Sequence, residues 1–156
     1  MRKLLNGVAI VCILVLSMVG CESGDCMLSS ESYCNMVFVN AQGKGVKLQD
    51  SLTVSSTADI VLVNRKYGAS SMMLPLSYTA VEDTFFLQYS ARLVDTLWVE
   101  HQNHPYFSSM DCGMVMHYEL VNIKSTNHLI DSVQIVNSGV SNTLKDNVKI
   151  YFTVAN

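Results

Sequence analysis

Residues 148–154 read Val-Lys-Ile-Tyr-Phe-Thr-Val, with an apolar side chain at every second position from Val148 to Val154. Side chains two residues apart lie on the same face of a β-strand, so this spacing indicates a strand with one buried face and one wetter face. The stretch therefore predicts a strand that covers one side of a hydrophobic core.

The same pattern recurs along the chain, between turn signals rich in Gly, Asn, Ser and Pro. No window of 11 residues shows the periodicity of a helix. Pro75 lacks a backbone donor and indicates an edge strand, and Pro105 predicts a break between strands. We expect an all-β, single-domain β-sandwich of immunoglobulin-like type over residues 34–156, because short strands at this spacing are typical of sandwiches and barrels. The other expected strands are 36–40, 47–55, 59–63, 72–76, 85–89, 97–101, 106–109, 113–121 and 130–136.

The beginning of the chain has the layout of a bacterial lipoprotein signal. Arg2 and Lys3 precede an apolar run over residues 4–16, and Gly20-Cys21 closes the segment. A signal core needs about 7–15 apolar residues, whereas a membrane-spanning helix needs about 20. We therefore predict a cleaved signal peptide over 1–20 and a lipidated tether over 21–33.

Lipidation at Cys21 predicts both compartment and attachment. A lipoprotein cysteine carries several acyl chains, and two or more chains anchor a protein stably. We expect the mature chain to be held through Cys21 in the cell envelope, at the outer membrane, on its periplasmic or its surface face.

The charge balance excludes one class of partner. The chain has 10 basic and 13 acidic residues, and removal of Arg2 and Lys3 with the signal leaves a net charge of −5. Nucleic-acid binding requires clustered Lys and Arg, and the longest basic cluster is Arg65-Lys66. We expect no nucleic-acid partner.

Met110, Cys112, Met114 and Met116 stand at every second position, and thioether and thiolate ligands favour Cu(I). Neighbours on one strand face are about 6.6–7 Å apart, however, while metal-bound sulfurs lie about 2.3 Å from the ion. Four consecutive ligands cannot converge in this way. We expect an apolar core stripe, and neither a metal nor another cofactor.

His101 and His104 have the spacing H-x-x-H, with Asp111 nearby. The pair spans a predicted strand end and a turn, and no second pair of ligands accompanies it. We interpret both as histidines at the rim of the sheet. Ser, His and Asp are all present, but no signature such as Gly-x-Ser-x-Gly joins them, and we predict that the protein is not an enzyme.

Three hydroxyls follow an aspartate and precede an apolar residue: Ser51, Thr96 and Ser132. This pattern resembles the O-glycosylation acceptor of Bacteroidetes-type envelope proteins. The alternative is that Asp-Ser and Asp-Thr serve as turn residues at strand starts. A modified hydroxyl is expected on an exposed rim.

Six stretches of the chain form a set of motifs: 51–54, 74–76, 95–99, 106–113, 127–133 and 149–152. Together they resemble one family of small uncharacterised all-β lipoproteins from Bacteroidetes-type bacteria, a domain of unknown function. They span nearly the whole mature chain, and Phe-Ser-x-x-x-Cys-Gly is the most specific of them. The resemblance implies an anchored all-β domain and transfers no catalytic residue.

Cys26, Cys34 and Cys112 remain once Cys21 is lipidated. In an oxidising envelope this odd number predicts one disulfide and one thiol, with three pairings open. The family resemblance favours Cys26–Cys112, because members typically keep a cysteine soon after the tether begins and one before the glycine. Cys34–Cys112 is the rival pairing.

These observations predict a non-enzymatic envelope lipoprotein that serves as a structural or protein-binding module, with the membrane and an envelope protein as partners. The alternative is a small-ligand or metal-binding lipoprotein, whose site would be the stripe 110–117 or the pair His101 and His104.

Overall fold

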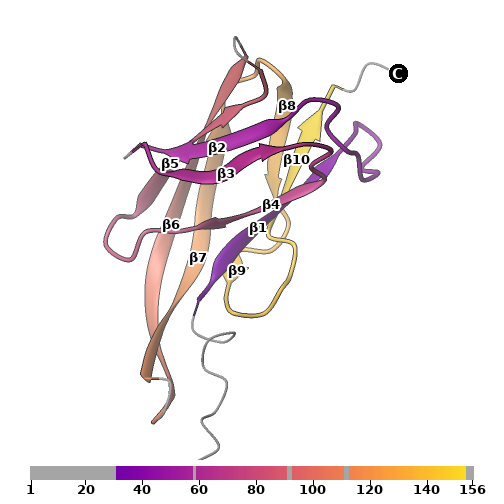
Figure 1. Cartoon of the computed structure of the whole chain (residues 1–156). Helices are drawn as coiled ribbons and strands as arrows, with labels where there is room; N and C mark the ends of the chain where they lie inside the picture. Colours follow the sequence, from indigo (N-terminus) through magenta and orange to yellow (C-terminus); the bar gives the residue numbers. More distant parts are fainter. Residues whose placement is uncertain (1–30, 58, 91–92, 111–112, 154–156) are drawn as a thin grey trace, which may run out of the picture.

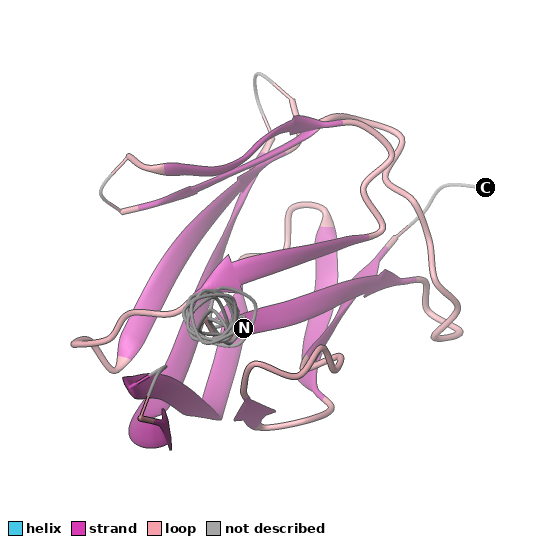
Figure 2. Ribbon diagram, turned by 60° about the horizontal axis from the view of Figure 1, so that its bottom comes forward, coloured by secondary structure: helices cyan, strands magenta, loops and turns pink. Residues whose placement is uncertain are grey.

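The computed structural model describes residues 31–57, 59–90, 93–110 and 113–153. This part of the chain contains strands, turns and loops, and no helix (Figure 2). The ten strands are β1 (Tyr33–Val39), β2 (Leu52–Ser56), β3 (Val61–Lys66), β4 (Ser71–Pro75), β5 (Glu82–Gln88), β6 (Val94–Ser109), β7 (Gly113–Ser125), β8 (Ile130–Ile135), β9 (Gly139–Val140) and β10 (Val148–Phe152).

The strands form two sheets that face each other (Figure 1). One sheet has the order β4-β1-β10-β8, and the other has the order β3-β2-β5-β6-β7-β9. β1 pairs in parallel with β10 and antiparallel with β4, so the first and last strands are neighbours at the centre of the smaller sheet. The prediction of an all-β, single-domain sandwich is confirmed.

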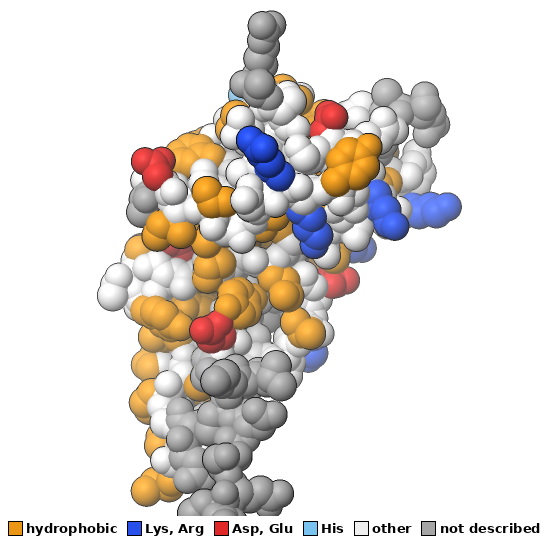
Figure 3. Space-filling view, viewed as in Figure 1, with side chains coloured by type: hydrophobic (Ala, Val, Ile, Leu, Met, Phe, Trp, Pro, Cys, Tyr) orange, Lys and Arg blue, Asp and Glu red, His pale blue; other side chains and the backbone are white. Residues whose placement is uncertain are grey.

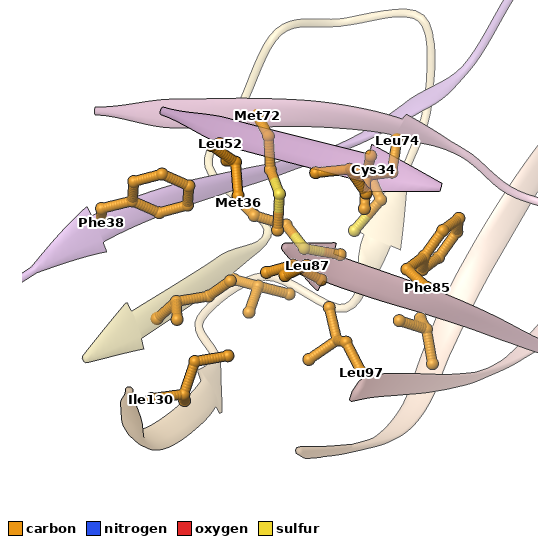
Figure 4. Close-up of a cluster of buried hydrophobic side chains, with 14 of the residues drawn as sticks. Cys34, Met36, Phe38, Leu52, Met72, Leu74, Phe85, Leu87, Leu97 and Ile130 are labelled. Carbon is orange, nitrogen blue, oxygen red and sulfur yellow. The ribbon is translucent and has the colours of Figure 1, made fainter. Parts of the chain in front are cut away.

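The core lies between the two sheets, where every second side chain of the central strands points inward. In β10, Val148, Ile150 and Phe152 are buried and the residues between them are half-buried, as the alternation predicts. Figure 4 shows side chains of β1 and β4 turned toward Leu87 of β5 and Leu97 of β6. Both leucines are fully buried, so the apolar positions of the sequence pattern form one contiguous core.

The expected strands reappear with shifted ends, and one expected break is absent. β4 is an edge strand that ends at Pro75, as the missing donor predicts. The predicted break at Pro105 is wrong, because β6 continues through it from Val94 to Ser109. Pro105 is opposite Met116 of β7, and no other strand pairs with β6 at that level in the described structure. A missing donor on an unpaired edge costs no ladder hydrogen bond.

The signal peptide, Cys21 and most of the predicted tether lie outside the described residues, as do Cys26 and Cys112. Within the described ranges, the chain has no helical segment with the length and hydropathy of a membrane span.

Candidate functional site

The long hairpin formed by β6 and β7 extends beyond the sandwich (Figure 1). β5 accompanies β6 only as far as Glu100, and β9 pairs with β7 only at Tyr118 and Glu119. Residues 102–109 and 113–117 therefore pair only with each other in the described structure, and we call this ribbon the hairpin arm. A two-stranded ribbon is marginally stable in water by itself, so its base needs support from the sandwich.

The arm exposes large apolar side chains near its tip. Phe107 and Met114 lie opposite each other across the ribbon and are 54% and 62% exposed. Tyr106 is 53% exposed and stacks on His117, and Met110 in the connecting turn is 91% exposed. Exposed apolar clusters of this kind mark contact surfaces.

These positions correct the prediction of a core stripe over 110–116. Met110 and Met114 are exposed and Met116 is half-buried, whereas Tyr118 and Leu120 further along the same face of β7 are buried. The alternation of the sequence is real, but the strand leaves the sandwich, so the same face changes from core to surface. Cys112 lies outside the described residues.

The base of the arm is fixed by His101, which is 1% exposed. Its Nε2 lies 3.0 Å from Asp83 Oδ2, and its Nδ1 lies 2.7 Å from Asn103 Oδ1. The ring also packs edge-on against Tyr118 at 5.3 Å between centroids. Both ring nitrogens therefore lie within hydrogen-bond distance of side-chain oxygens, one on β5 and one on β6.

The partners of His101 tie the arm to the loop before β5. Asn103 Nδ2 donates to the carbonyl oxygens of Tyr78 and Ala80, each at 3.0 Å. The Ser77 amide donates to Asp83 Oδ2 at 2.7 Å. The polar groups of His101, Asp83 and Asn103 are thus hydrogen-bonded to one another and to the loop before β5. We call this cluster the lock at the base of the arm.

The interpretation of His101 as a rim histidine is wrong, and that of His104 is consistent with the structure. A register shift between Glu100 and His101 precedes the pair, and the two side chains occupy opposite faces of β6. The His104 ring lies 3.7 Å from Glu119 at the surface. Among the described residues, no group of three or more His, Cys, Asp or Glu side chains converges as a metal site would require.

Asp95 is a second buried polar centre, which the sequence analysis did not single out. It is 0% exposed, and its carboxylate accepts hydrogen bonds from the amides of His128, Leu129 and Ile130. The Thr126 hydroxyl donates to it at 2.7 Å. A charged residue at an inward position of a strand is the only sequence signal that marks it. It fixes the turn between β7 and β8 to the start of β6.

The three predicted O-glycosylation hydroxyls lie in different settings. Ser132 is exposed on β8, an edge strand of the smaller sheet. Ser51 is half-buried just before β2, and Thr96 is half-buried on the outer face of the larger sheet, with β5 and β7 on either side of its strand. Ser132 is therefore the hydroxyl of the three that fits the expected exposed rim.

Cys34 carries a free thiol that is 0% exposed in the core. Burial raises the pKa of this thiol to about 12, because the thiolate is poorly solvated there. The Cys26–Cys112 pairing would leave Cys34 as the thiol, and this pairing stays a prediction because both of its cysteines lie outside the described residues.

We expect Cys34 to resist alkylation at pH 8 in the folded protein and to react roughly a hundredfold faster in denaturant, because burial removes both access and thiolate. Peptide mass spectrometry of the Cys34 peptide after timed exposure to iodoacetamide measures this. Equal alkylation rates with and without denaturant would contradict the buried position.

Two surface depressions lie near Tyr89. One, of about 190 Å³, is lined by Leu48, Leu129 and Phe152, and is smaller than the roughly 300–1,000 Å³ of ordinary ligand sites. The other, of about 400 Å³, is polar and lined by Ser51, Thr53, Asn64, Arg65, Gln88, Tyr89 and Ser90. The second depression has the size of a small-ligand site.

β3 is an edge strand of the larger sheet and is exposed along most of its length. Ile60 and Val61 at its start are 58% and 54% exposed, and Tyr67 beyond its end is 78% exposed. A free strand edge with apolar side chains can pair with a strand from another chain. Arg65 has a positive φ of 44°, and the register shifts within the β2–β3 pairing. One shift falls between Val61 and Val63 and the other between Val63 and Lys66, so both halves of β3 are irregular.

The profile of a family of unknown function (DUF6452) matches residues 34–152, which correspond to the sandwich. The chain belongs to this family. No curated protein and no solved structure matches it.

Proposed function

We propose that the protein is a non-enzymatic lipoprotein of the cell envelope, anchored at the outer membrane through Cys21, which binds another envelope protein through the open edge of its larger sheet. The exposed start of β3 is the observation that carries the binding part of this proposal. The sequence Gly20-Cys21 behind an apolar run carries the anchoring part.

The structural roles of the buried polar residues support a non-enzymatic function. His101, Asp83 and Asn103 use their polar atoms to hold the base of the arm. Asp95 is fully buried and is engaged by backbone amides. Groups held in this way are not presented to a substrate.

The edge of β3 supports binding by strand addition. Its outer backbone groups have no strand partner in the described structure, and Val61 is one of the exposed apolar residues beside them. A partner strand gains main-chain hydrogen bonds and apolar contacts together.

Two measurements test this proposal in intact cells. A photoreactive amino acid at Val61 is expected to form a covalent adduct with one envelope protein, whereas the same label at Leu144, which is 81% exposed in a loop, should not. Cys21→Ser is expected to release the protein from the membrane fraction. Equal labelling at both positions would contradict the edge site, and membrane retention of Cys21→Ser would contradict the anchor.

A second candidate function is small-ligand binding in the polar depression beside Arg65. Its volume and its lining by hydroxyls, amides and one guanidinium favour a small polar or acidic ligand. Native mass spectrometry of protein purified from its own envelope would detect a small molecule retained by the wild type and lost from Arg65→Ala.

A further inference from the structure

We propose that the apolar tip of the hairpin arm lies in the interface of the lipid bilayer that holds the anchor, so that the protein contacts the membrane at two points. This inference rests on the anchor at Cys21 in the proposed function. It assigns a partner to the arm, whereas the edge of β3 serves a protein partner.

The side chains at the tip have the composition of a membrane-interface contact. Tyr106, Phe107, Met110 and Met114 each expose more than half of their surface. Aromatic residues are enriched where a protein meets the boundary between lipid and water, and flexible methionine side chains adapt to irregular apolar surroundings. Burial of these four side chains in the interface removes apolar surface from water.

The arm carries no basic side chain, and the sequence places one carboxylate, Asp111, between Met110 and Gly113. No Lys or Arg occurs between Glu100 and Lys124. Figure 3 shows apolar side chains along the part of the molecule formed by the hairpin, with the basic side chains of this face elsewhere. Glu119, at the base of the arm, pairs with His104. The attraction to the bilayer is therefore apolar rather than electrostatic.

The arm projects from the side of the sandwich where the tether joins it. In Figure 1, the tip of the β6–β7 hairpin and the start of β1 both lie toward the lower end of the molecule. Tyr33 at the start of β1 is opposite Pro75 of β4, and the hydroxyl of Tyr118, beside the base of the arm, donates to the carbonyl oxygen of Leu76 at 2.9 Å. The start of β1 and the base of the arm are thus close neighbours.

The available lengths allow the lipid and the tip to reach one surface. The segment from Cys21 to Tyr33 spans at most about 40 Å when fully extended, and an eight-residue strand such as 102–109 spans about 24 Å. An anchored domain therefore stays close to the bilayer. The tip reaches the lipid surface when the arm points toward the membrane. This constraint favours lipid over a second copy or a protein as the occupant of the tip.

The lock at the base gives the arm a fixed direction. His101 joins Asp83 and Asn103, and Asn103 is bonded to the loop at Tyr78. A ribbon held in this way can act as a rigid spacer, which keeps the sandwich and its β3 edge away from the lipid headgroups.

Quenching by brominated lipids tests the contact. In a Trp98→Phe background, Phe107→Trp places the single indole at the tip, and Tyr67→Trp places it at the β3–β4 turn as the matched control. Each lipidated full-length variant is reconstituted into phosphatidylcholine vesicles with and without brominated acyl chains. We expect roughly threefold stronger quenching for Phe107→Trp, because interfacial contacts reach only about 5–10 Å into the bilayer.

The outcomes separate the inference from the anchor. A protein that does not float with the vesicles refutes the anchor itself. A protein that floats but shows equal quenching at both positions refutes the bilayer contact of the arm. The contact is also refuted if the Phe107→Trp indole is shielded by a second copy, which chemical cross-linking on the same vesicles would detect. Thermal unfolding of both variants confirms that each is folded.

Discussion

Replacement of Asp95 by asparagine is expected to lower the free energy of unfolding at pH 7 by about 3 kcal/mol. The wild-type carboxylate accepts hydrogen bonds from the amides of His128, Leu129 and Ile130 and from the Thr126 hydroxyl. An asparagine offers one acceptor oxygen, and its amide group faces backbone donors. Some donors are then buried without a partner. Urea denaturation followed by circular dichroism measures the loss.

The same substitution should change the acid sensitivity of the fold. Burial by itself would raise the pKa of Asp95, but the four hydrogen bonds outweigh it and hold the pKa below 3.8. The stability that this carboxylate contributes is therefore present above pH 3.8 and is lost as the pH falls through the lower folded-state pKa.

The gap in stability between the wild type and Asp95→Asn should be constant from pH 7 to about 5 and should narrow below about pH 4. Asp50→Asn, at an exposed aspartate, is the matched control and should change stability by less than about 0.5 kcal/mol. A gap that stays constant down to pH 3 would contradict a charged Asp95 in the folded state.

The alternation of apolar residues predicted most of the fold, because it reports which face of a strand is buried. In β10 the pattern from Val148 to Phe152 is the burial pattern observed. Pro75 marked an edge strand correctly, since a missing donor is tolerated only where no neighbour needs it. The pairing of β1 with β10 was not predictable, because partners over 100 residues apart leave no local signal.

The same alternation failed in the hairpin arm. Met114 and Tyr118 lie on one face of one strand, yet Met114 is 62% exposed and Tyr118 is 3% exposed. The alternation shows which side chains share a face of the strand, but it does not show whether another sheet covers that face. Where β6 and β7 leave the sandwich, a stripe that reads as core becomes a contact surface.

The buried polar centres were also outside the reach of a one-dimensional pattern. Asp83 lies 18 residues from His101, and Asp95 lies 33 residues from His128. Their roles depend on loops that return to a strand, so only the three-dimensional structure brings the partners together. His101 and His104 show this most clearly. They are three residues apart on one strand, yet the first side chain is buried and the second is exposed.

His101→Ala is expected to lower the free energy of unfolding by about 3 kcal/mol, because it removes two buried hydrogen bonds and leaves Asp83 and Asn103 without their shared partner. It also removes the ring contact with Tyr118. The effect should be largest at the arm, whose strands depend on this lock. Hydrogen exchange at residues 113–117 is expected to accelerate more than exchange in β10.

His104→Ala is the matched control, because His104 lies three residues further along the same strand and its side chain is 54% exposed. Its surface pair with Glu119 should contribute less than about 0.5 kcal/mol. If both histidine variants lose the same stability, or if His101→Ala leaves the exchange of the arm unchanged, His101 does not lock the base. If only His101→Ala loosens the arm, the buried His101 ring holds the base of the arm. The direction of the apolar tip then depends on this ring and on the loop before β5 to which it is connected.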